Sequence, residues 1–436
     1  MLPIRFHLVP CKSFLEILIR KYFTINDIIN GFFIALLLSN TIFLTLFDNI
    51  FLNFISPFLA IYGFYKLFEF NKIKFFYTGF FVGILWFYWV SFSLIYYNLS
   101  FLIPLEILIF GIVYGLIFLI CGAFKNKLIR AILLLSISYF YPFNFNWLNL
   151  ELTLLSGIFE PSLRGLGSVF CFILFFYYLK KYKYLASIFL LFALQIEEKE
   201  PNFLPFKTDI TNTQISQFIK WDPAYKDLHI NEALKMIDDS IKNGYKFVIL
   251  PENAFVVYLN LEDELIDVLK EKSNKITILT GALTYEKDFQ YNSSYLFKDG
   301  AISRFDKFEL VPFGEEIPLP KFLTNIINDI FFDGAMDFKK AKSYSEYEVD
   351  TILIRNAICY EATRAKTYEG SPKFIVAISN NGWFTPSTEP NLQRMLIKYY
   401  STKHGTTIYH SANGSKSEVI TPKRLWIKEF LGFIKI

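Results

Sequence analysis

Three polar side chains in the second half of the chain each follow a short apolar run that is typical of a β-strand. With their preceding runs they are Glu252 after 247–250, Lys307 after 302–305 and Cys359 after 349–358. Strand ends are where a layered α/β domain presents its reactive groups. A carboxylate, an ammonium and a thiol brought together there have the residue types that acyl transfer through a thioester requires.

Cys359 is the only cysteine after position 171, so the polar half of the chain can form no internal disulfide. A single cysteine is most often an inert buried thiol, and its interpretation as a nucleophile depends on the carboxylate and the ammonium. A free thiol has a pKa of about 8.5 and needs a base or a positive neighbour. No histidine is well placed in the sequence, so we expect Glu252 to act as the general base. Lys307 would then stabilise the oxyanion of the tetrahedral intermediate.

The composition excludes several classes of protein. The chain has 436 residues, of which 53% are hydrophobic, and a mean hydropathy of +0.34, which is too apolar for an ordinary soluble protein. The net charge is only +4, and the polar half has no dense basic block, so no nucleic-acid partner is expected. There is no CxxC pair and no HExxH pattern, so we expect neither a metal site nor a cofactor.

The apolar residues crowd into the first half and predict a membrane domain. A spanning helix needs about 20 largely apolar residues, and seven candidates occur, the last two of them short: 28–47, 49–65, 75–97, 101–124, 131–150, 165–179 and 184–196. Lys and Arg are concentrated in the N-terminal arm and in the loops after the second, fourth and sixth spans. By the positive-inside rule this alternation puts the N-terminus in the cytoplasm and the following domain in the periplasm. If one short segment is a re-entrant or interfacial helix, the α/β domain would lie on the opposite side of the membrane.

The chain is therefore predicted to have three parts. Residues 1–196 form a membrane domain with about seven helices, and residues 197–425 alternate strand and helix patterns, which favours an α/β domain with a mixed sheet. Residues 426–436 are an apolar tail that is too short to span a membrane. We expect the tail to lie at the membrane interface or to pack on the domain.

Three motifs in this order resemble the Glu–Lys–Cys triad of the nitrilase superfamily. They are Leu250-Pro251-Glu252-Asn253, the run 305–315 that contains Lys307 and ends in Phe313-Gly314-Glu315, and Ile358-Cys359-Tyr360-Glu361. A fourth block, Asn380-Asn381-Gly382-Trp383-Phe384, also looks like the family. The resemblance implies an α-β-β-α sandwich as the fold of the polar half.

One branch of that superfamily, the apolipoprotein N-acyltransferases, carries a multi-span N-terminal half, and this chain is similar to it over most of its length. The block from Thr213 to Trp221 and the stripe from Gly83 to Ser91 also resemble that branch. The resemblance implies a bacterial inner-membrane enzyme. It would move an acyl chain from a phospholipid, such as phosphatidylethanolamine, to the N-terminal amine of diacylglyceryl-cysteine in a lipoprotein.

The resemblance also implies roles for residues around the triad. Tyr360 and Glu361 would line the site, and Glu315 would orient or neutralise Lys307, although plain structural support explains these three residues equally well. Trp221, Trp383 and Phe384 could hold acyl chains or pack in the core. The chain departs from the branch at Asn381-Gly382, where Asp-Ala is usual, and in the helix and strand that follow.

Two other functions remain open at the level of the sequence. A membrane-tethered amidase of the nitrilase type would pass the acyl group to water, but it would have no need of seven spans. A receptor or transporter without catalytic activity would leave the order of Glu252, Lys307 and Cys359 unexplained.

Overall fold

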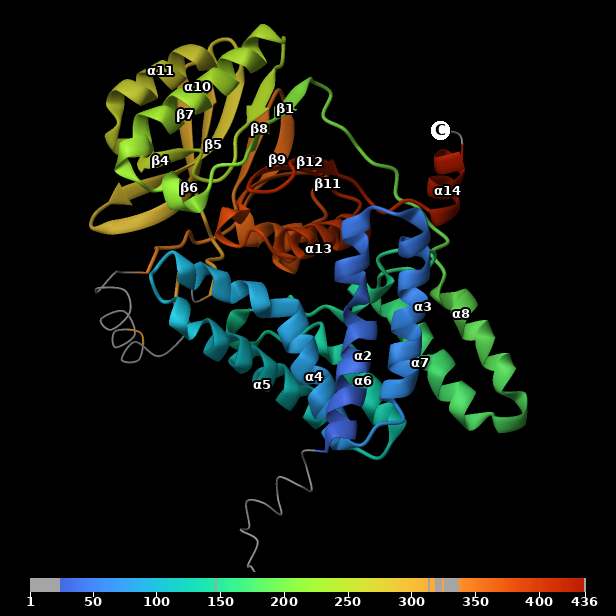
Figure 1. The fold of residues 1–436 in the computed structure, drawn as a ribbon. Coiled ribbons are helices and arrows are strands. Elements are labelled where there is room, and N and C mark those ends of the chain that lie inside the picture. The colour runs from blue at the N-terminus through green and yellow to red at the C-terminus, as the bar shows by residue number, and fades with distance from the viewer. Residues whose placement is uncertain (1–23, 146, 313, 318–323, 325–336, 435–436) are drawn as a thin grey trace, which may run out of the picture.

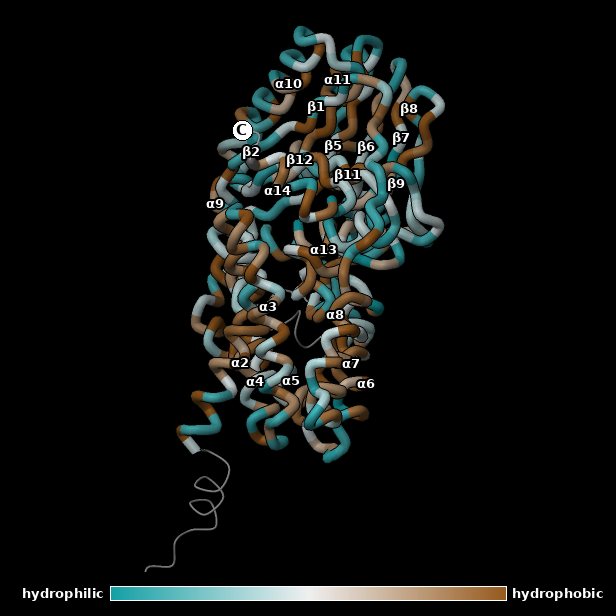
Figure 2. The backbone as a smooth tube through the Cα atoms, turned by 90° about the vertical axis from the view of Figure 1, so that its right-hand side faces the viewer, coloured by the Kyte–Doolittle hydropathy of each residue, from teal (hydrophilic) through white to brown (hydrophobic). Residues whose placement is uncertain are grey.

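The computed structural model describes residues 24–434 apart from 146, 313, 318–323 and 325–336. It consists of a bundle of apolar helices and an α/β half that sits on one end of the bundle (Figure 1). Figure 2 shows hydrophobic residues gathered along the bundle helices and hydrophilic residues at the far end of the bundle.

Among the described residues, four helical stretches are long and apolar enough to cross a membrane. They are α2 with the 3-10 turn η1 (Ile25–Phe47), α3 (Ile50–Leu67), α4 with η2 (Lys72–Ile95), and η3 with α5 (Ser100–Gly122). Large apolar side chains such as Phe33, Phe51 and Leu105 are more than half exposed on the outside of this bundle. Exposed apolar surface of this extent is what a lipid environment covers.

The predicted helix at 131–150 is wrong in its bounds. Helix α6 spans Lys127–Ile137, and short 3-10 turns take its place before α7 (Leu163–Tyr178) begins. Pro142 cannot continue a helix. The segment also carries Glu151, which is buried and accepts hydrogen bonds from the hydroxyls of Tyr139 and Tyr399. The segment predicted at 184–196 is likewise divided, into η6 (Lys180–Ser187) and the short α8 (Ile188–Ala193). The number of seven spans stays a prediction.

Small residues let α4 (Lys72–Phe87) and α5 (Ile103–Gly122) approach each other closely. A Cβ atom at Gly83 would lie 2.6 Å from the carbonyl oxygen of Phe110, and one at Gly79 would lie 2.4 Å from that of Tyr114. Glycine at helix contacts of this kind allows backbones in a membrane to pack together. The close packing of α4 on α5 therefore explains the glycine at position 83.

The α/β half contains two mixed sheets of six strands each within the described residues. In the first sheet the order is β1 (Thr208–Ile210), β3 (Phe247–Ile249), β5 (Thr277–Glu286), β6 (Phe289–Lys298) and β7 (Ala301–Asp306), with β4 (Phe255–Tyr258) also on β5. In the second it is β12 (Glu418–Ile420), β11 (Thr407–Asn413), β10 (Phe374–Asn380), β9 (Ile352–Ile358) and β8 (Glu346–Val349), with β2 (Asn212–Thr213) on β11. Strands β1, β3 and β5 run parallel, as do β9, β10 and β11.

Helices cover both outer faces of the two sheets, which gives the predicted α-β-β-α sandwich (Figure 1). Helices α10 (Lys226–Lys242) and α11 (Asp263–Ser273) pack on the first sheet through a core of their own. Apolar residues of both sheets, such as Ile249 and Ile378, fill the space between them. The fold class expected from the sequence is confirmed.

Helix α13 (Glu389–His404) covers the second sheet and also contacts the membrane bundle. One hydrophobic core runs from bundle residues such as Phe64, through Met395 and Tyr399 of α13, to Ile375 of the second sheet. Helix α13 thus covers the second sheet on one side and the end of the bundle on the other, and the two halves share this core.

The C-terminal tail forms helix α14 (Trp426–Ile434) and packs against α3. The ring of Trp426 lies 4.6 Å from that of Phe54, and the ring of Phe433 lies 6.2 Å from that of Phe51. Ile427 and Leu431 are about half exposed. The tail therefore packs on a membrane helix, and an ion pair of 2.9 Å between Lys428 and Glu198 also joins it to the start of the α/β half.

Trp147 joins the membrane half to the segment that follows Cys359. Its Nε1 donates a hydrogen bond of 2.9 Å to Oγ1 of Thr363, and its ring contacts those of Trp89 and Tyr360. Tyr360 donates a second bond of 3.0 Å to the carbonyl oxygen of Asn144. The segment that follows Cys359 is thus held against the bundle by polar and aromatic contacts together.

We expect Trp147→Ala to destabilise the protein by about 3 kcal/mol, because it leaves a large cavity and removes the partner of Thr363. Trp147→Phe should cost less, since it keeps a ring for the stack and loses only the hydrogen bond. Thermal unfolding in detergent measures both variants. Phe101→Ala, which truncates a side chain that is 71% exposed, is the control and should leave the midpoint unchanged.

Candidate active site

The three predicted catalytic residues meet between the two sheets, at the ends of three strands. Glu252 follows β3, Lys307 follows β7, and Cys359 follows β9 directly. Glu252 and Lys307 come from the first sheet and Cys359 from the second. The site therefore exists only where both sheets face each other.

Glu252 is buried, and both of its carboxylate oxygens are fixed. Oε1 accepts a hydrogen bond of 2.7 Å from Nδ2 of Asn292, and Oε2 accepts one of 2.8 Å from the backbone N–H of Asn380 at the end of β10. Gly281 makes room for this loop, since a Cβ atom there would lie 2.7 Å from the Cα of Glu252. The carboxylate is thus held rigidly at the junction of the two sheets.

Lys307 is 1% exposed and its ammonium lies between two carboxylates. Its Nζ is 2.8 Å from Oε2 of Glu315 and 3.6 Å from Oε1 of Glu252. Burial alone would lower the pKa of Lys307, but the charges of Glu315 and Glu252 raise it above its ordinary value. Lys307 therefore stays a cation inside the protein.

Glu315 also forms hydrogen bonds within its own loop and with Asn292. Its Oε2 accepts a hydrogen bond of 2.8 Å from the backbone N–H of Val311, and its Oε1 accepts one from Asn292. Glu315 thus pairs with the ammonium of Lys307 and is itself held by the backbone of its own loop.

Cys359 adopts a left-handed backbone conformation, with φ of +52°. This conformation is uncommon for a residue other than glycine and is found where a structure holds a reactive group in place. Burial and the charge of Glu252 raise the pKa of the thiol well above its usual range, and Lys307 lowers it. The ionised Glu252 therefore disfavours the thiolate of Cys359, and the ammonium of Lys307 favours it.

Glu361 and Tyr360 support the nucleophile segment from behind. The Glu361 carboxylate accepts hydrogen bonds from the backbone N–H groups of Ile358, Phe308 and Glu309. It ties the end of β9 to the loop of Lys307. Burial raises the pKa of Glu361 to about 7. Tyr360 is buried and points its hydroxyl at Asn144 of the membrane half.

The three aromatic residues expected to contact substrate lie in different places. Trp383 packs against Tyr96 and Tyr97 of the membrane half, with ring distances of 5.4 Å and 6.0 Å. Phe384 packs 5.0 Å from Trp89 at the edge of the shared core. Trp221 is 37% exposed, just after α9 (Gln217–Lys220). The membrane half therefore borders the segment after β10.

The sequence did not single out the side chains that hold the triad. Asn292 bridges Glu252 and Glu315 from the middle of β6, where no motif marks it. Lys220 is buried and donates a hydrogen bond of 3.2 Å to the carbonyl oxygen of Glu252, and burial lowers its pKa to about 8. Asn380 and Lys220 do belong to blocks of the sequence that resembled the family, which is the signal that could have found them.

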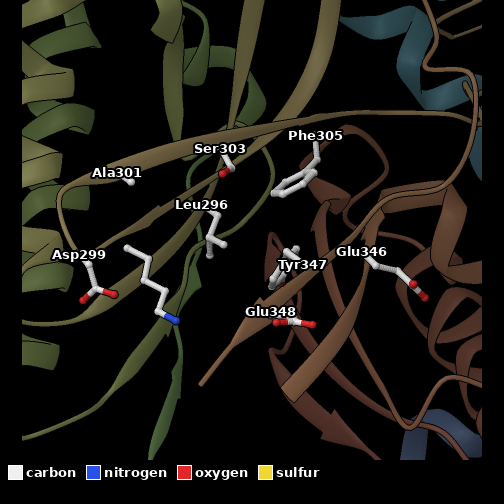
Figure 3. Close-up of a pocket in the computed structure, with 9 residues that line it drawn as sticks. Leu296, Asp299, Ala301, Ser303, Phe305, Glu346, Tyr347 and Glu348 are labelled. Carbon is white, nitrogen blue, oxygen red and sulfur yellow. The ribbon is translucent and has the colours of Figure 1, made fainter. Parts of the chain in front are cut away.

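A surface pocket elsewhere in the α/β half contains none of these residues. It lies where β6 and β7 face β8, and Figure 3 shows Glu346 and Glu348 near Tyr347 and Asp299 at the opposite side. The pocket thus lies apart from the cluster of Glu252, Lys307 and Cys359.

Comparisons with known proteins bear on both halves of the chain. A family model described as apolipoprotein N-acyltransferase integral membrane domain matches residues 25–196. An apolipoprotein N-acyltransferase of Campylobacter jejuni is 41% identical over 440 residues, which cover 99% of this chain and 98% of the relative. One of Helicobacter pylori is 35% identical over 360 residues, which cover 80% of this chain and 83% of the relative.

Solved structures give weaker likenesses. A CN-hydrolase superfamily protein from Xanthomonas campestris is 12% identical, covers 50% of this chain and 83% of its own, and has a TM-score of 0.36. A nitrilase-superfamily amidase from Nesterenkonia is 11% identical, covers 51% and 86%, and has a TM-score of 0.37. The family of the chain follows from its sequence relatives. With 41% identity to the Campylobacter jejuni relative over 99% of its length, the chain belongs to the apolipoprotein N-acyltransferase family.

Proposed function

We propose that Glu252, Lys307 and Cys359 catalyse acyl transfer from a membrane phospholipid to the N-terminal amine of a diacylated lipoprotein. The observation that carries this proposal is the buried ammonium of Lys307, which lies between Glu252 and Glu315 beside the strained Cys359. The relatives, which are named for this activity, support it.

In the first half of the reaction Cys359 takes the acyl chain from the donor. Glu252 accepts the thiol proton while Sγ attacks the carbonyl carbon of the fatty-acyl ester, and Lys307 stabilises the oxyanion. The ester C–O bond then breaks, and the lysophospholipid alkoxide leaves with the proton from Glu252. The acyl chain remains on Cys359 as a thioester.

In the second half the acceptor amine attacks the thioester carbon. Glu252 takes a proton from the attacking nitrogen, the C–S bond breaks, and the thiolate of Cys359 recovers that proton. The products are the N-acylated lipoprotein and the free thiol. If water attacked in place of the amine, the product would be a fatty acid, and the enzyme would be a hydrolase.

The position of the basic loops supports a periplasmic site. The loops after α3, α5 and α7 lie at the end of the bundle away from the α/β half (Figure 1). Arg130 joins two of them, since it donates hydrogen bonds to the carbonyl oxygens of Phe70 and Gly122. Lys127 lies 3.8 Å from the ring centroid of Tyr177 near the third. Basic residues at one end mark that end as cytoplasmic, and the chain then passes to the periplasm before residue 197, in the bacterial inner membrane.

A reporter fused after Ile196 tests this orientation. A periplasmic phosphatase should be active at this point, and a reporter that works only in the cytoplasm should be inactive. A fusion after Lys72 should give the reverse pattern and serves as the matched control. Cytoplasmic activity after Ile196 would overturn both the orientation and the proposed substrate.

Cys359→Ala should abolish uptake of label from phospholipid that carries a radioactive acyl chain, because no other thiol lies in the α/β half. Cys359→Ser should be almost as poor, since a hydroxyl is far less ionised than a thiol. On the wild type the label should be released by hydroxylamine, as a thioester is. Labelled Cys359→Ala protein would show that the nucleophile is another residue.

Replacement of Lys307 and replacement of Glu252 should change the alkylation rate of Cys359 in opposite directions. Lys307 lowers the pKa of the thiol and Glu252 raises it. At pH 8, Lys307→Met should therefore react more slowly with iodoacetamide than the wild type, and Glu252→Gln should react faster, by about tenfold per unit of pKa. Both variants should lose acyl transfer.

The alkylation rates are compared in a background without Cys11, Cys121 and Cys171, so that only Cys359 reacts. Lys298→Met, a change at the pocket of Figure 3, is the control for loss of a lysine and should leave the rate unchanged. Equal rates in all variants would remove Lys307 and Glu252 from contact with the thiol.

A further inference from the structure

Among the described residues near Cys359, the carboxyl groups of Glu252, Glu315 and Glu361 are hydrogen-bonded within the protein, and a fourth belongs to Glu389. Glu252 is held by Asn292 and by the backbone of Asn380, and Glu315 is held by Lys307, Asn292 and the backbone of Val311. Glu361 accepts three backbone hydrogen bonds. Each carboxylate oxygen of these three residues already accepts at least one hydrogen bond from the protein.

The fourth carboxyl group, Glu389, differs from the others. It is the first residue of α13 and is 1% exposed, yet its Oε2 has no hydrogen-bond partner among the residues that the structure describes. Two neighbouring polar atoms, Oγ1 of Thr388 and Nε2 of Gln393, are also buried without a partner. A buried polar atom without a partner is costly, and in native proteins such atoms mark a missing water or ligand.

Glu389 begins the helix that packs on the segment of Cys359 and that also contacts the membrane half. Helix α13 packs on the 3-10 turn η9 (Cys359–Thr363), and the charge of Glu389 acts on Cys359 more strongly than that of Glu315 does. The backbone N–H of the adjacent Thr388 donates a hydrogen bond of 3.2 Å to the hydroxyl of Tyr88 in the membrane half. A lipid substrate that reaches Cys359 from the membrane would therefore pass this carboxyl group.

The carboxyl group of Glu389 determines which chemical group of a substrate it can bind. Phosphate groups and ester oxygens carry negative charge or lone pairs, and they gain nothing from a carboxylate. A primary ammonium offers three N–H donors and a positive charge, and hydrogen bonds to charged groups are stronger than neutral ones. Burial raises the pKa of Glu389 well above its ordinary range, so the carboxylate forms when a bound cation, together with the N-terminus of α13, compensates for the lost hydration.

We propose that Glu389 binds the primary amino group of a lipid substrate next to Cys359. This inference rests on the proposed function and adds a residue to it. Two substrates carry such a group: the acceptor, through its N-terminal amine, and a phosphatidylethanolamine donor, through its headgroup. Glu389 accepts an N–H hydrogen bond in either case, and the proton and bond changes of the reaction stay with Glu252 and Cys359.

The test separates the two halves of the reaction in Glu389→Gln and Glu389→Ala. The first half is followed as thioester label on Cys359 from phosphatidylethanolamine and, separately, from phosphatidylglycerol. The second half is followed as transfer of that label to a synthetic diacylated lipopeptide with a free amine. Glu264→Gln removes a first-turn carboxylate from α11, far from the site, and is the matched control.

Two results support the inference. If the acceptor amine is bound, label uptake stays within about twofold of the wild type, while kcat/KM for the lipopeptide falls about tenfold or more. If the headgroup amine is bound, label uptake from phosphatidylethanolamine falls by that amount and uptake from phosphatidylglycerol does not. Normal uptake from one substrate in either case shows that the variant is folded.

Two other results overturn it. A loss that is equal for both donors would make Glu389 a part of the scaffold of Cys359, and wild-type rates in every arm would leave it without a role. The proposed function fails separately: a wild-type protein that forms the thioester but gives only free fatty acid is a hydrolase, whatever Glu389 does.

A binding measurement gives a readout without catalysis. In Cys359→Ala, the lipopeptide with a free amine should bind about tenfold more tightly than its N-acetylated form, and the added Glu389→Gln change should remove that preference. An unchanged preference in the double variant would contradict binding of the acceptor amine and leave the headgroup arm to decide.

Discussion

The buried ammonium of Lys307 constrains the whole catalytic centre. A cation removed from water is tolerated only where charges and hydrogen bonds compensate for its lost hydration. Glu315 contacts it directly and Glu252 lies 3.6 Å away. Each carboxylate in turn needs fixed donors, which Asn292, the backbone of Asn380 and the backbone of Val311 supply. The loops after β3, β7 and β10 are thereby tied to one another through a single charge.

In the proposed mechanism, this network lets a thiol with a raised pKa serve as the nucleophile. Glu252 disfavours the thiolate while it is ionised and no longer does so once it has taken the proton. Deprotonation of Cys359 and protonation of Glu252 are therefore coupled events, and Lys307 is already in place for the oxyanion. The resting enzyme keeps its nucleophile neutral in the absence of a substrate.

Much of this arrangement could be predicted from the sequence because it depends on local patterns. Glu252, Lys307 and Cys359 each follow an apolar run, and strand ends of a layered domain meet at one edge. Asn292 and Glu389 could not be found in this way, since their roles depend on contacts between distant segments. The helix predicted at 131–150 failed for the same reason: Glu151 is buried under α13 by hydrogen bonds that hydropathy does not register.

The core that runs without a break from the bundle through α13 to the second sheet bears on how such a protein can evolve. A domain joined to its anchor by a flexible linker is modular, and either part can be exchanged by recombination. Here α13 belongs both to the sandwich and to the core of the membrane bundle, and Trp147 and Tyr360 form hydrogen bonds between the two halves near Cys359. Substitutions on one side of that seam have to be matched on the other, so the two halves are inherited as one unit.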